Sequence, residues 1–302
     1  MSKGVVFINN KFVPLQKAAV PVTDLAVQRG YGASEVFRTY HRIPFELDSH
    51  LRRLERSLKL LHLPLSVSRS KLEQIIAQGT RRLPHGEVLV KILVTGGPGD
   101  HIMPLGRPSL IVIFTPNHMS PLALYRRGLA LKTFFFHPYM PFAKTVNYLH
   151  AILAQVDARK AGYDEALFHG PHGGITEGTT YNFALIKRAR VITPRAGVLK
   201  GITMDVALRV AKTLGFKVVR RQLSERDLRS CDEAFTTSTM REVMPVVRVD
   251  KILIGRGKPG KYAKLLLEAF RNYAGNKNKQ ISKRVSLGRG DGGLSGRRRH
   301  RK

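Results

Sequence analysis

The sequence predicts an α+β protein of two domains, a smaller N-terminal α/β sandwich and a larger barrel-like α/β domain, followed by a disordered basic tail. Strand-like and helical stretches alternate in both halves of the chain. Between the halves, the stretch TPNHMSPLALYRR breaks this pattern with two prolines, an asparagine and a serine. Near the C-terminus, Gly, Ser, Lys and Arg replace apolar residues from about Asn276 onward. We therefore place domains at 1–115 and 128–274, a linker at 116–127 and the tail at 275–302.

The first half begins with a hairpin, because the strand-like runs VVFI and FV flank Asn9 and Asn10. A second strand pair follows in EVFRTYHRIPFEL. The next stretch, HLRRLERSLKLLHL, changes to a helical period, with leucines on one face until Pro64 ends it. A further helix at 70–83 and strands at 87–96 and 108–114 complete this compact mixed unit.

The second half continues the alternation of strands and helices. Strand LALKTFF leads into the helix NYLHAILAQVDARKAG and then into a hairpin at 165–186. We expect helices at 203–215, 224–231 and 261–275, with strands at 190–194, 217–223, 233–239 and 243–250. We interpret this half as a separate α+β or barrel-like domain.

Composition limits the class of protein. The chain has 302 residues, of which 43% are hydrophobic, so it can bury a sizeable core. Its single cysteine, Cys231, excludes a disulfide framework and offers no metal-ligand spacing, so we expect no bound metal. The N-terminus lacks the apolar run of a signal peptide, and no stretch is long and apolar enough to span a membrane. We therefore expect a cytoplasmic protein.

The formal charge of +31 is extreme, and the tail carries only part of it. The segment 275–302 holds ten Lys/Arg and one Asp. A body this basic attracts nucleic acid, acidic lipid or phosphorylated metabolites in a salt-dependent way. No known nucleic-acid-binding motif accompanies the charge, so we expect only non-specific binding of nucleic acid or membrane, if any.

One lysine stands apart from the rest. In FFFHPYMPFAKTVNYLHAILAQV, Lys144 is the only formally charged residue before Asp157, in a chain where 24% of residues are charged. A lysine kept from water by aromatic and aliphatic neighbours has an amine that can act as a nucleophile or base. The alternative is an ordinary lysine that extends its amine to solvent from an apolar face.

A glutamate in the second half has a comparable setting. In ITEGTTYNFALI, Glu177 follows a PHGG turn and lies between two strand-like segments, beside Gly178 and small hydroxyl residues. Alone it would be read as a surface glutamate of a hairpin. In combination with Lys144 it becomes a candidate for the same site.

Two further segments suit a phosphate. In VLKGITMDVALRVAKTLG, Gly201 leads into a helix that starts near Ile202 and Thr203, where free backbone N–H groups attract anions. In EAFTTSTMREVMP, four consecutive hydroxyls, 236–239, end a strand and can donate hydrogen bonds. A plain helix cap by Thr203 and a structural threonine cluster remain alternatives. A basic side chain is also needed, and Arg53, beside the core-facing Leu54, is one of three arginines in HLRRLERSL.

Taken in order, these segments resemble the class IV, or fold type IV, pyridoxal-phosphate aminotransferases. That family includes branched-chain aminotransferase, D-amino-acid aminotransferase and aminodeoxychorismate lyase. The resemblance covers roughly 5–274 and rests on five motifs. They are H-x-x-R-L at 50–54, K-x-x-N-Y-L at 144–149, T-E-G at 176–178, L-K-G-I-T-x-D at 199–205 and S-T-x-x-E-x-x-P-V at 238–246.

The resemblance implies roles for these residues and a cofactor, pyridoxal 5'-phosphate (PLP). Lys144 would hold PLP as an aldimine and then move the proton between substrate and cofactor. Glu177, supported by Asn182, would keep the pyridine nitrogen protonated, and Tyr148 would bond the phenolic oxygen of PLP. The implied phosphate ligands are Arg53, Ile202, Thr203, Ser238 and Thr239.

Other segments bear on the substrate. RGYGASEVFRTY is about four residues shorter than the family pattern, so the substrate contact of Tyr31 is provisional, whereas Arg38 matches the arginine of the EGIR motif in branched-chain enzymes. In GGPGDHIMP, a loop that reaches the neighbouring subunit in the family, His101 is present, but Gly99 replaces the arginine of D-amino-acid aminotransferases. This favours the branched-chain branch over the D-amino-acid branch.

We therefore expect an aminotransferase that acts on an amino acid and a 2-oxo acid, with branched-chain L-amino acids as donors, assembled as a homodimer or an oligomer of dimers. D-amino-acid transamination and aminodeoxychorismate lysis remain alternatives within the family. A different class of function, polyanion binding on a retained aminotransferase fold, has the charge of +31 in its favour.

Overall fold

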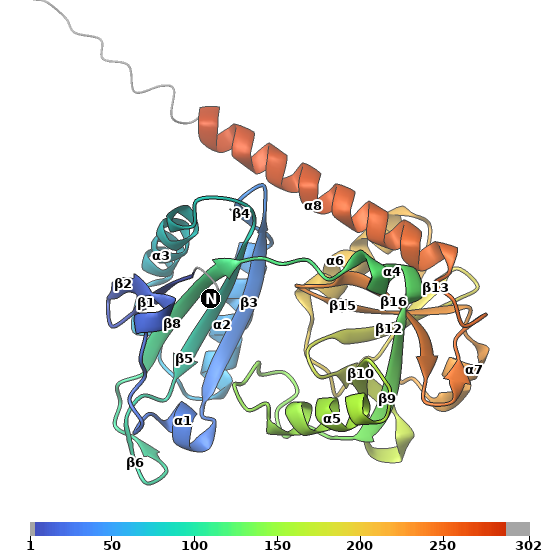
Figure 1. The fold of residues 1–302 in the computed structure, drawn as a ribbon, viewed down its shortest axis with the longest axis horizontal. Helices are drawn as coiled ribbons and strands as arrows, with labels where there is room; N and C mark the ends of the chain where they lie inside the picture. Colours follow the sequence, from blue (N-terminus) through green and yellow to red (C-terminus); the bar gives the residue numbers. More distant parts are fainter. Residues whose placement is uncertain (1–3, 288–302) are drawn as a thin grey trace, which may run out of the picture.

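The computed structural model describes residues 4–287 of the chain, apart from the side chains of His172 and 278–287. Two β-sheets organise it, one on each side of Figure 1. The first is a six-stranded antiparallel sheet in the order β2-β1-β8-β5-β3-β4. Its strands are β1 (Val5–Ile8), β2 (Lys11–Pro14), β3 (Gly32–Tyr40), β4 (Ile43–Pro44), β5 (Val88–Thr95) and β8 (Ser109–Pro116).

Two helices cover one face of this sheet, α2 (Leu47–Leu60) and α3 (Arg69–Arg82). Their apolar faces and the inward residues of the strands form one core, which includes Phe37, Leu54 and Phe114. The hairpin β1–β2 turns at Asn9 and Asn10, which both adopt positive φ, as a tight two-residue hairpin requires. Three short elements lie at the edges: η1 (Leu15–Lys17), α1 (Leu25–Arg29) and the hairpin β6 (Gly99–Asp100) with β7 (Met103–Pro104).

The second sheet contains the strands from β9 onward. They are β9 (Leu129–Phe135), β10 (Glu165–His169), β11 (Ile175–Gly178), β12 (Asn182–Lys187), β13 (Arg190–Thr193), β14 (Lys217–Arg220), β15 (Glu233–Ser238), β16 (Glu242–Val249) and β17 (Ile252–Leu253). Their order is β11-β10-β9-β16-β15-β12-β13-β14, with β17 beside β16. Because β11 also pairs with β12, six strands close into a barrel, and β13 and β14 extend it on one side. This confirms the predicted barrel-like domain.

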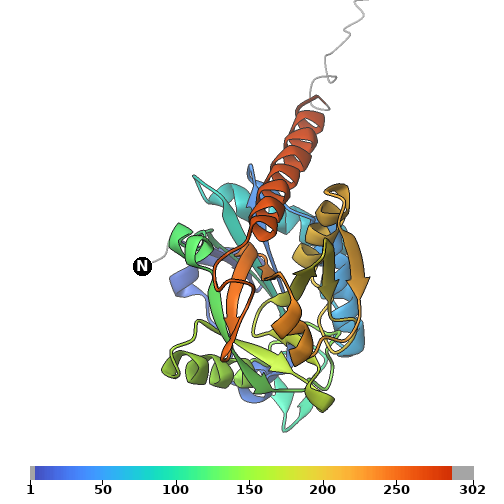
Figure 2. The ribbon, with the colours of Figure 1, turned by 90° about the vertical axis from the view of Figure 1, so that its right-hand side faces the viewer.

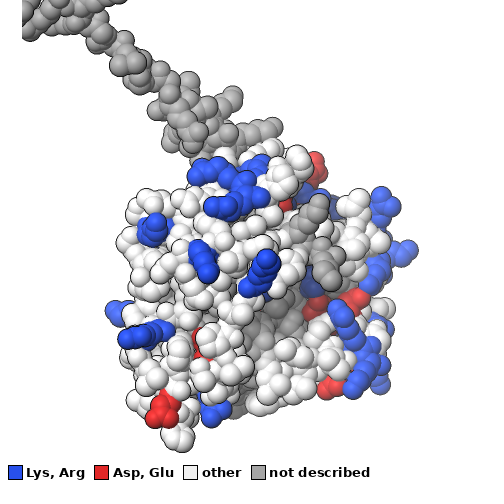
Figure 3. All heavy atoms as spheres, turned by 60° about the vertical axis from the view of Figure 1, so that its left-hand side comes forward, with Lys and Arg blue, Asp and Glu red and all other residues white. Residues whose placement is uncertain are grey.

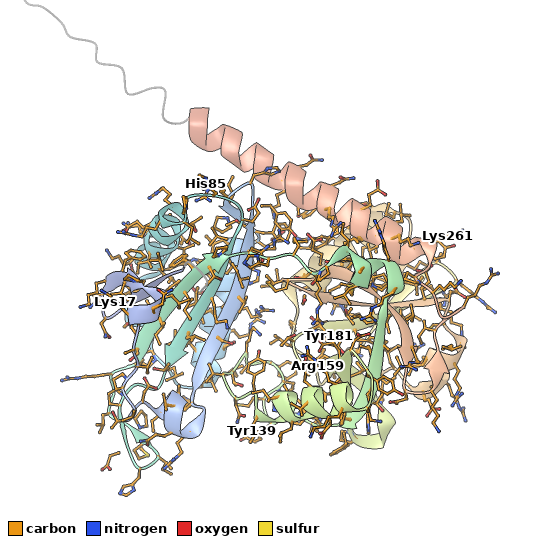
Figure 4. The ribbon with its side chains drawn as sticks, in the orientation of Figure 1. Lys17, His85, Tyr139, Arg159, Tyr181 and Lys261 are labelled. Atoms are coloured by element: carbon orange, nitrogen blue, oxygen red, sulfur yellow. The ribbon has the colours of Figure 1, made fainter. Side chains whose placement is uncertain are left out.

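Helices pack around the barrel, and apolar side chains such as Leu131, Phe183 and Met244 fill it. Helix α5 (Leu149–Lys160) lies against β9 and β10, and η2 (Pro171–Gly173) and α7 (Glu225–Ser230) are short connections. Helices α6 (Ile202–Thr213) and α8 (Lys261–Leu287) share a second core outside the barrel with β12 and β15. In Figure 4, Tyr181 lies within this domain, where its hydroxyl donates to the Ala166 carbonyl over 2.7 Å.

The segment predicted as a linker, 116–127, contains a helix, α4 (Leu122–Arg127), which the prolines in the sequence concealed. Tyr125 of α4 is buried, and its hydroxyl donates to the Arg241 carbonyl over 3.0 Å. The connection is therefore packed against the large domain for part of its length.

The predicted start of a disordered tail at residue 275 is wrong for 275–287, because α8 continues to Leu287. Figure 2 shows the end of this helix extending beyond the body of the molecule. Lys277 contributes to its position, since its ammonium pairs with Glu46 at 2.6 Å, 231 residues away in sequence. The rest of the predicted tail, 288–302, lies outside the described residues. Within the described part of the chain, no helix is long and apolar enough to cross a membrane.

Candidate active site

The site is built around Lys144, in the segment that joins β9 to α5. The ammonium of Lys144 lies 3.0 Å from the hydroxyl of Tyr148, the residue that precedes α5. The side chain is half-buried.

Glu177 lies close enough to Lys144 for their charges to interact. Both oxygens of its carboxylate accept the Leu199 N–H, at 3.1 and 3.0 Å. The amide of Asn182, directly opposite on β12, donates to Glu177 Oε2 and to the Leu199 carbonyl, at 2.9 Å each. Burial raises the pKa of Glu177 to about 8, although the Leu199 N–H and the Lys144 and Arg53 charges act in the opposite direction. The pair of Glu177 and Asn182 expected from the sequence is therefore present.

Arg53, on the buried face of α2, is held in place by a carboxylate that the sequence analysis missed. Its guanidinium donates to both oxygens of Glu35, at 2.9 and 2.6 Å, and to the Lys200 carbonyl at 3.0 Å. Glu35 is fully buried on β3 and also contacts His50 Nδ1 at 2.9 Å. Burial alone would raise its pKa, but the charges of Arg53 and His50 hold the pKa of Glu35 well below its ordinary value. The charged residues Glu35 and Arg38 within the strand segment EVFR were the available signal.

The start of α6 lies beside Arg53. Gly201 is the N-cap of α6 and no side chain caps the helix, so the first N–H groups, including those of Ile202 and Thr203, have no partner within it. The alternative of a cap by Thr203 is therefore excluded. A Cβ on Gly201 would lie 1.7 Å from Asn182 Oδ1, so no side chain fits at this position. Asn182, Leu199 and Gly201 also line a cavity of about 390 Å³, whose lining does not include Lys144, Glu177 or Arg53.

The hydroxyl cluster on β15 contributes differently from what was expected. Ser238 accepts the Arg241 N–H at 3.3 Å, and Thr239 donates to the Val36 carbonyl at 3.1 Å. By contrast, the hydroxyls of Thr236 and Thr237 are buried and have no hydrogen-bond partner among the described residues. Thr237 pairs in register with Asn182, so it lies on the same part of the sheet as the Glu177 network.

These features fit the phosphate and ring of PLP. A phosphate needs N–H donors, a cation and hydroxyls. The uncapped start of α6, Arg53 and the unpartnered hydroxyl of Thr237 are groups of these three kinds, whereas Thr236, the preceding residue of the same strand, points to the opposite face of the sheet. Glu177 is a buried carboxyl that can face a protonated ring nitrogen, and Lys144 provides the amine.

The three residues that the sequence predicts as substrate contacts each have partners in the small domain, in the large domain or in solvent. Tyr31 packs against the core of the small domain, and its hydroxyl donates to the Leu61 carbonyl at 2.5 Å. Arg38 is buried, stacks on the Tyr40 ring and pairs with Glu242 at 3.5 Å. His101 lies at the β6–β7 turn with its side chain 93% exposed. For Tyr31 and Arg38, the sequence did not reveal partners that are distant along the chain.

Comparisons with known proteins agree with this geometry. Residues 32–249 match the family described as amino-transferase class IV. A putative branched-chain-amino-acid aminotransferase of Methanocaldococcus jannaschii is 31% identical over 276 residues, which are 88% of this chain and 95% of that protein. D-alanine aminotransferase of Bacillus licheniformis is 28% identical over 274 residues, covering 88% and 96%. A crystal structure of the T.th. branched-chain amino acid aminotransferase with pyridoxamine 5'-phosphate has a TM-score of 0.85 at 28% identity, covering 91% and 95%.

Proposed function

Because the chain belongs to the class IV aminotransferases, we propose that this PLP-dependent transaminase transfers the amino group of a branched-chain L-amino acid to a 2-oxo acid. The observation that carries the choice of substrate is the 31% identity to a putative branched-chain enzyme over 95% of its length.

We propose the following roles for the residues around Lys144. When bound, PLP supplies an aldehyde that carries the amino group and a ring that accepts electrons. Lys144 binds the aldehyde end and moves the proton at the substrate Cα, with Tyr148 oriented against its amine at 3.0 Å. Glu177 holds a proton at the ring nitrogen, and Asn182 and the Leu199 N–H fix the orientation of its carboxylate.

The phosphate end is proposed to bind between the two domains. Arg53 neutralises charge while Glu35 fixes the direction of its guanidinium. Ile202 and Thr203 donate their N–H groups from the start of α6. Thr237 joins Ser238 as a hydroxyl donor, because its own hydroxyl has no other described partner, whereas the hydroxyl of Thr239 already donates to the Val36 carbonyl. The protein therefore holds these groups in place before the cofactor binds.

The experiment that tests the substrate is a panel of L- and D-amino acids with 2-oxoglutarate or pyruvate. We expect kcat/KM for leucine, isoleucine and valine to exceed that for D-alanine by about a hundredfold or more. A preference for D-alanine would assign the chain to the branch of its Bacillus licheniformis relative. Release of pyruvate from aminodeoxychorismate without any amino acceptor would instead indicate a lyase.

We also propose that the protein assembles as a homodimer through α5. The inner face of α5 carries the small residues Ala151, Ala154 and Ala158, which pack against the barrel. Its large apolar side chains point outward, with Leu149 66%, Ile152 58% and Leu153 56% exposed. The first turns of α5 are therefore apolar on both sides, and apolar helix faces are normally buried. In the homodimer expected from the sequence, a second copy of this chain would cover the outward face of α5.

A further inference from the structure

A hydroxyl on α2 contacts the backbone of the lysine. Ser57 is completely buried, and its Oγ accepts the Lys144 N–H at 3.1 Å. The same Oγ donates to the Arg53 carbonyl, one turn earlier in α2, at 3.0 Å. Ser57 therefore connects the segment that carries Lys144 to the helix that carries Arg53.

A second contact holds the other side of Lys144. The Lys144 carbonyl accepts the Ser34 N–H at 2.8 Å, and two residues later the Val146 N–H donates to the Gly32 carbonyl at 3.0 Å. Both peptide groups of Lys144 are thus bonded to the small domain, through α2 and β3. Its side chain, in contrast, meets Tyr148 of the large domain.

The Ser57 hydroxyl is not needed to complete α2. In a regular helix the Arg53 carbonyl already accepts the N–H of residue 57, so the hydroxyl adds a second bond to a satisfied acceptor. The other buried positions of α2 include the apolar Leu54 and Leu58 as well as the polar His50 and Arg53. A small apolar residue would fit the helix equally well, and it would leave the Lys144 N–H without its acceptor.

We propose that Ser57 is a positioning residue that sets the distance between Lys144 and Arg53. This inference rests on the proposed function, in which the two residues bind opposite ends of one rigid cofactor. Ser57 and Arg53 are one helical turn apart, about 6 Å along the axis. Because α2 fixes this spacing, it holds the phosphate contact and the lysine backbone in register, although Lys144 belongs to the segment after the linker.

The test compares Ser57→Ala with Thr80→Ala. Thr80 is a matched control, since it is a buried hydroxyl of α3 that donates to the carbonyl four residues earlier, at 2.8 Å, in the same domain. The first measurement is hydrogen exchange at the Lys144 amide in the cofactor-free protein. We expect exchange to be about tenfold faster in Ser57→Ala and unchanged in Thr80→Ala, because only the first substitution removes the acceptor of that N–H.

The second measurement is the kinetics of the loaded enzyme. A displaced lysine lowers kcat, by about tenfold, while KM for the amino acid stays within about twofold, because the substrate contacts are intact. Ser57→Cys, which keeps a weak acceptor, should recover part of the loss. Thr80→Ala should match the wild type in both constants.

Several results would overturn the proposal. Fast exchange of the Lys144 amide in the wild type would do so even if no Ser57 variant folds. Equal loss of kcat in Thr80→Ala and Ser57→Ala would reduce Ser57 to a general contribution to stability. A wild type with a protected Lys144 amide but no transaminase activity would refute the proposed function and leave the Ser57 contact in place.

Discussion

Lys144 can be separated from other lysines in a similar environment. Lys132, on β9, also lies among aromatic rings, 5.9 Å from Phe134 and 5.6 Å from Tyr163. We expect Lys144→Ala to abolish both the yellow colour of the loaded protein and transaminase turnover, because no other described amine faces Tyr148 and Glu177. Lys132→Ala should keep both. Visible absorbance and mass spectrometry after borohydride reduction measure the outcome, and a PLP adduct on another lysine in Lys144→Ala would disprove the assignment.

Glu177 gives a second prediction, on catalysis. Glu177→Gln should retain PLP, because the phosphate contacts are untouched, but should slow the half-reaction with an amino acid by about a hundredfold. A neutral amide no longer favours a protonated ring nitrogen. Single-turnover absorbance changes measure this rate. Turnover equal to that of the wild type would remove Glu177 from the mechanism.

The same substitution predicts a pH dependence of stability. The pKa of Glu177 is about 8 in the folded cofactor-free protein, compared with 4.5 for an unperturbed glutamate. Between these values the folded state binds one proton more than the unfolded state, so stability falls as pH rises. Cofactor-free wild type should therefore lose Tm relative to Glu177→Gln between pH 5 and pH 8. A constant difference in Tm across this range would contradict the raised pKa.

Individual residues differed in how well the sequence predicted them. The environments of Lys144 and Glu177 are visible locally, because their neighbours in sequence are also their neighbours in space. The substrate contacts of Tyr31 and Arg38 stay predictions, but the sequence did not reveal their partners in the structure, Leu61 and Glu242, which are 30 and 204 residues away. Glu35 was missed for the same reason, since its role depends on α2.

Helix α5 carries the prediction on assembly. Its outward apolar face should be covered by a second copy, so a charge there should break the dimer. We expect Ile152→Lys to give a monomer in light scattering and to lose most turnover, because the loop around His101 is proposed to complete the partner's site. Leu253→Lys, at a similarly exposed leucine of β17, is the control and should stay dimeric. An active monomeric wild type would refute the proposed assembly.

Other elements show where periodicity fails as evidence. The hairpin β1–β2 and helix α2 were predicted because turn residues and leucine spacing are local signals. Helix α4 was missed because prolines precede it, and α8 was ended too early at Gly275. That glycine lies within the helix with a normal φ, and the extension gains the ion pair of Lys277 with Glu46. Contacts with a distant element decided where this helix ends.

Residues of both domains form the candidate site. The small domain contributes Arg53 and Glu35, and the large domain contributes Glu177 and the start of α6. The sequence predicted the order of the motifs and the two-domain plan, which we retain as a proposal at 1–115 and 128–274. It did not predict the contacts across the domains, such as those of Ser57 and Glu46, because these depend on the packing of one domain against the other.

The charge of +31 is distributed over the molecule, and Figure 3 shows basic side chains spread over one face among few acidic ones. Such a surface attracts polyanions without providing a specific site. Binding of nucleic acid should therefore be weak, independent of sequence and strongly reduced by salt. We therefore expect polyanion binding to be a non-specific property of the enzyme and not a separate function.

Removing the basic C-terminal residues separates this property from catalysis. A chain that ends at Ala274 loses ten Lys/Arg and one Asp, including Lys277. Glu46 keeps Arg209 and Tyr273 as partners, so removal of the ion pair, which is partly exposed, costs at most about 1 kcal/mol. We expect PLP binding, oligomeric state and turnover to persist, while affinity for DNA falls and its dependence on salt becomes less steep, by about 0.9 in log–log slope for each DNA phosphate that is no longer neutralised. A chain that ends at Leu287 keeps Lys277 and the described helix. Its affinity for DNA should lie between those of the wild type and of the chain that ends at Ala274, and its Tm should match that of the wild type. Loss of transaminase activity in the shorter chain alone would mean that 275–287 supports the active site, and loss in both would mean that 288–302 does so.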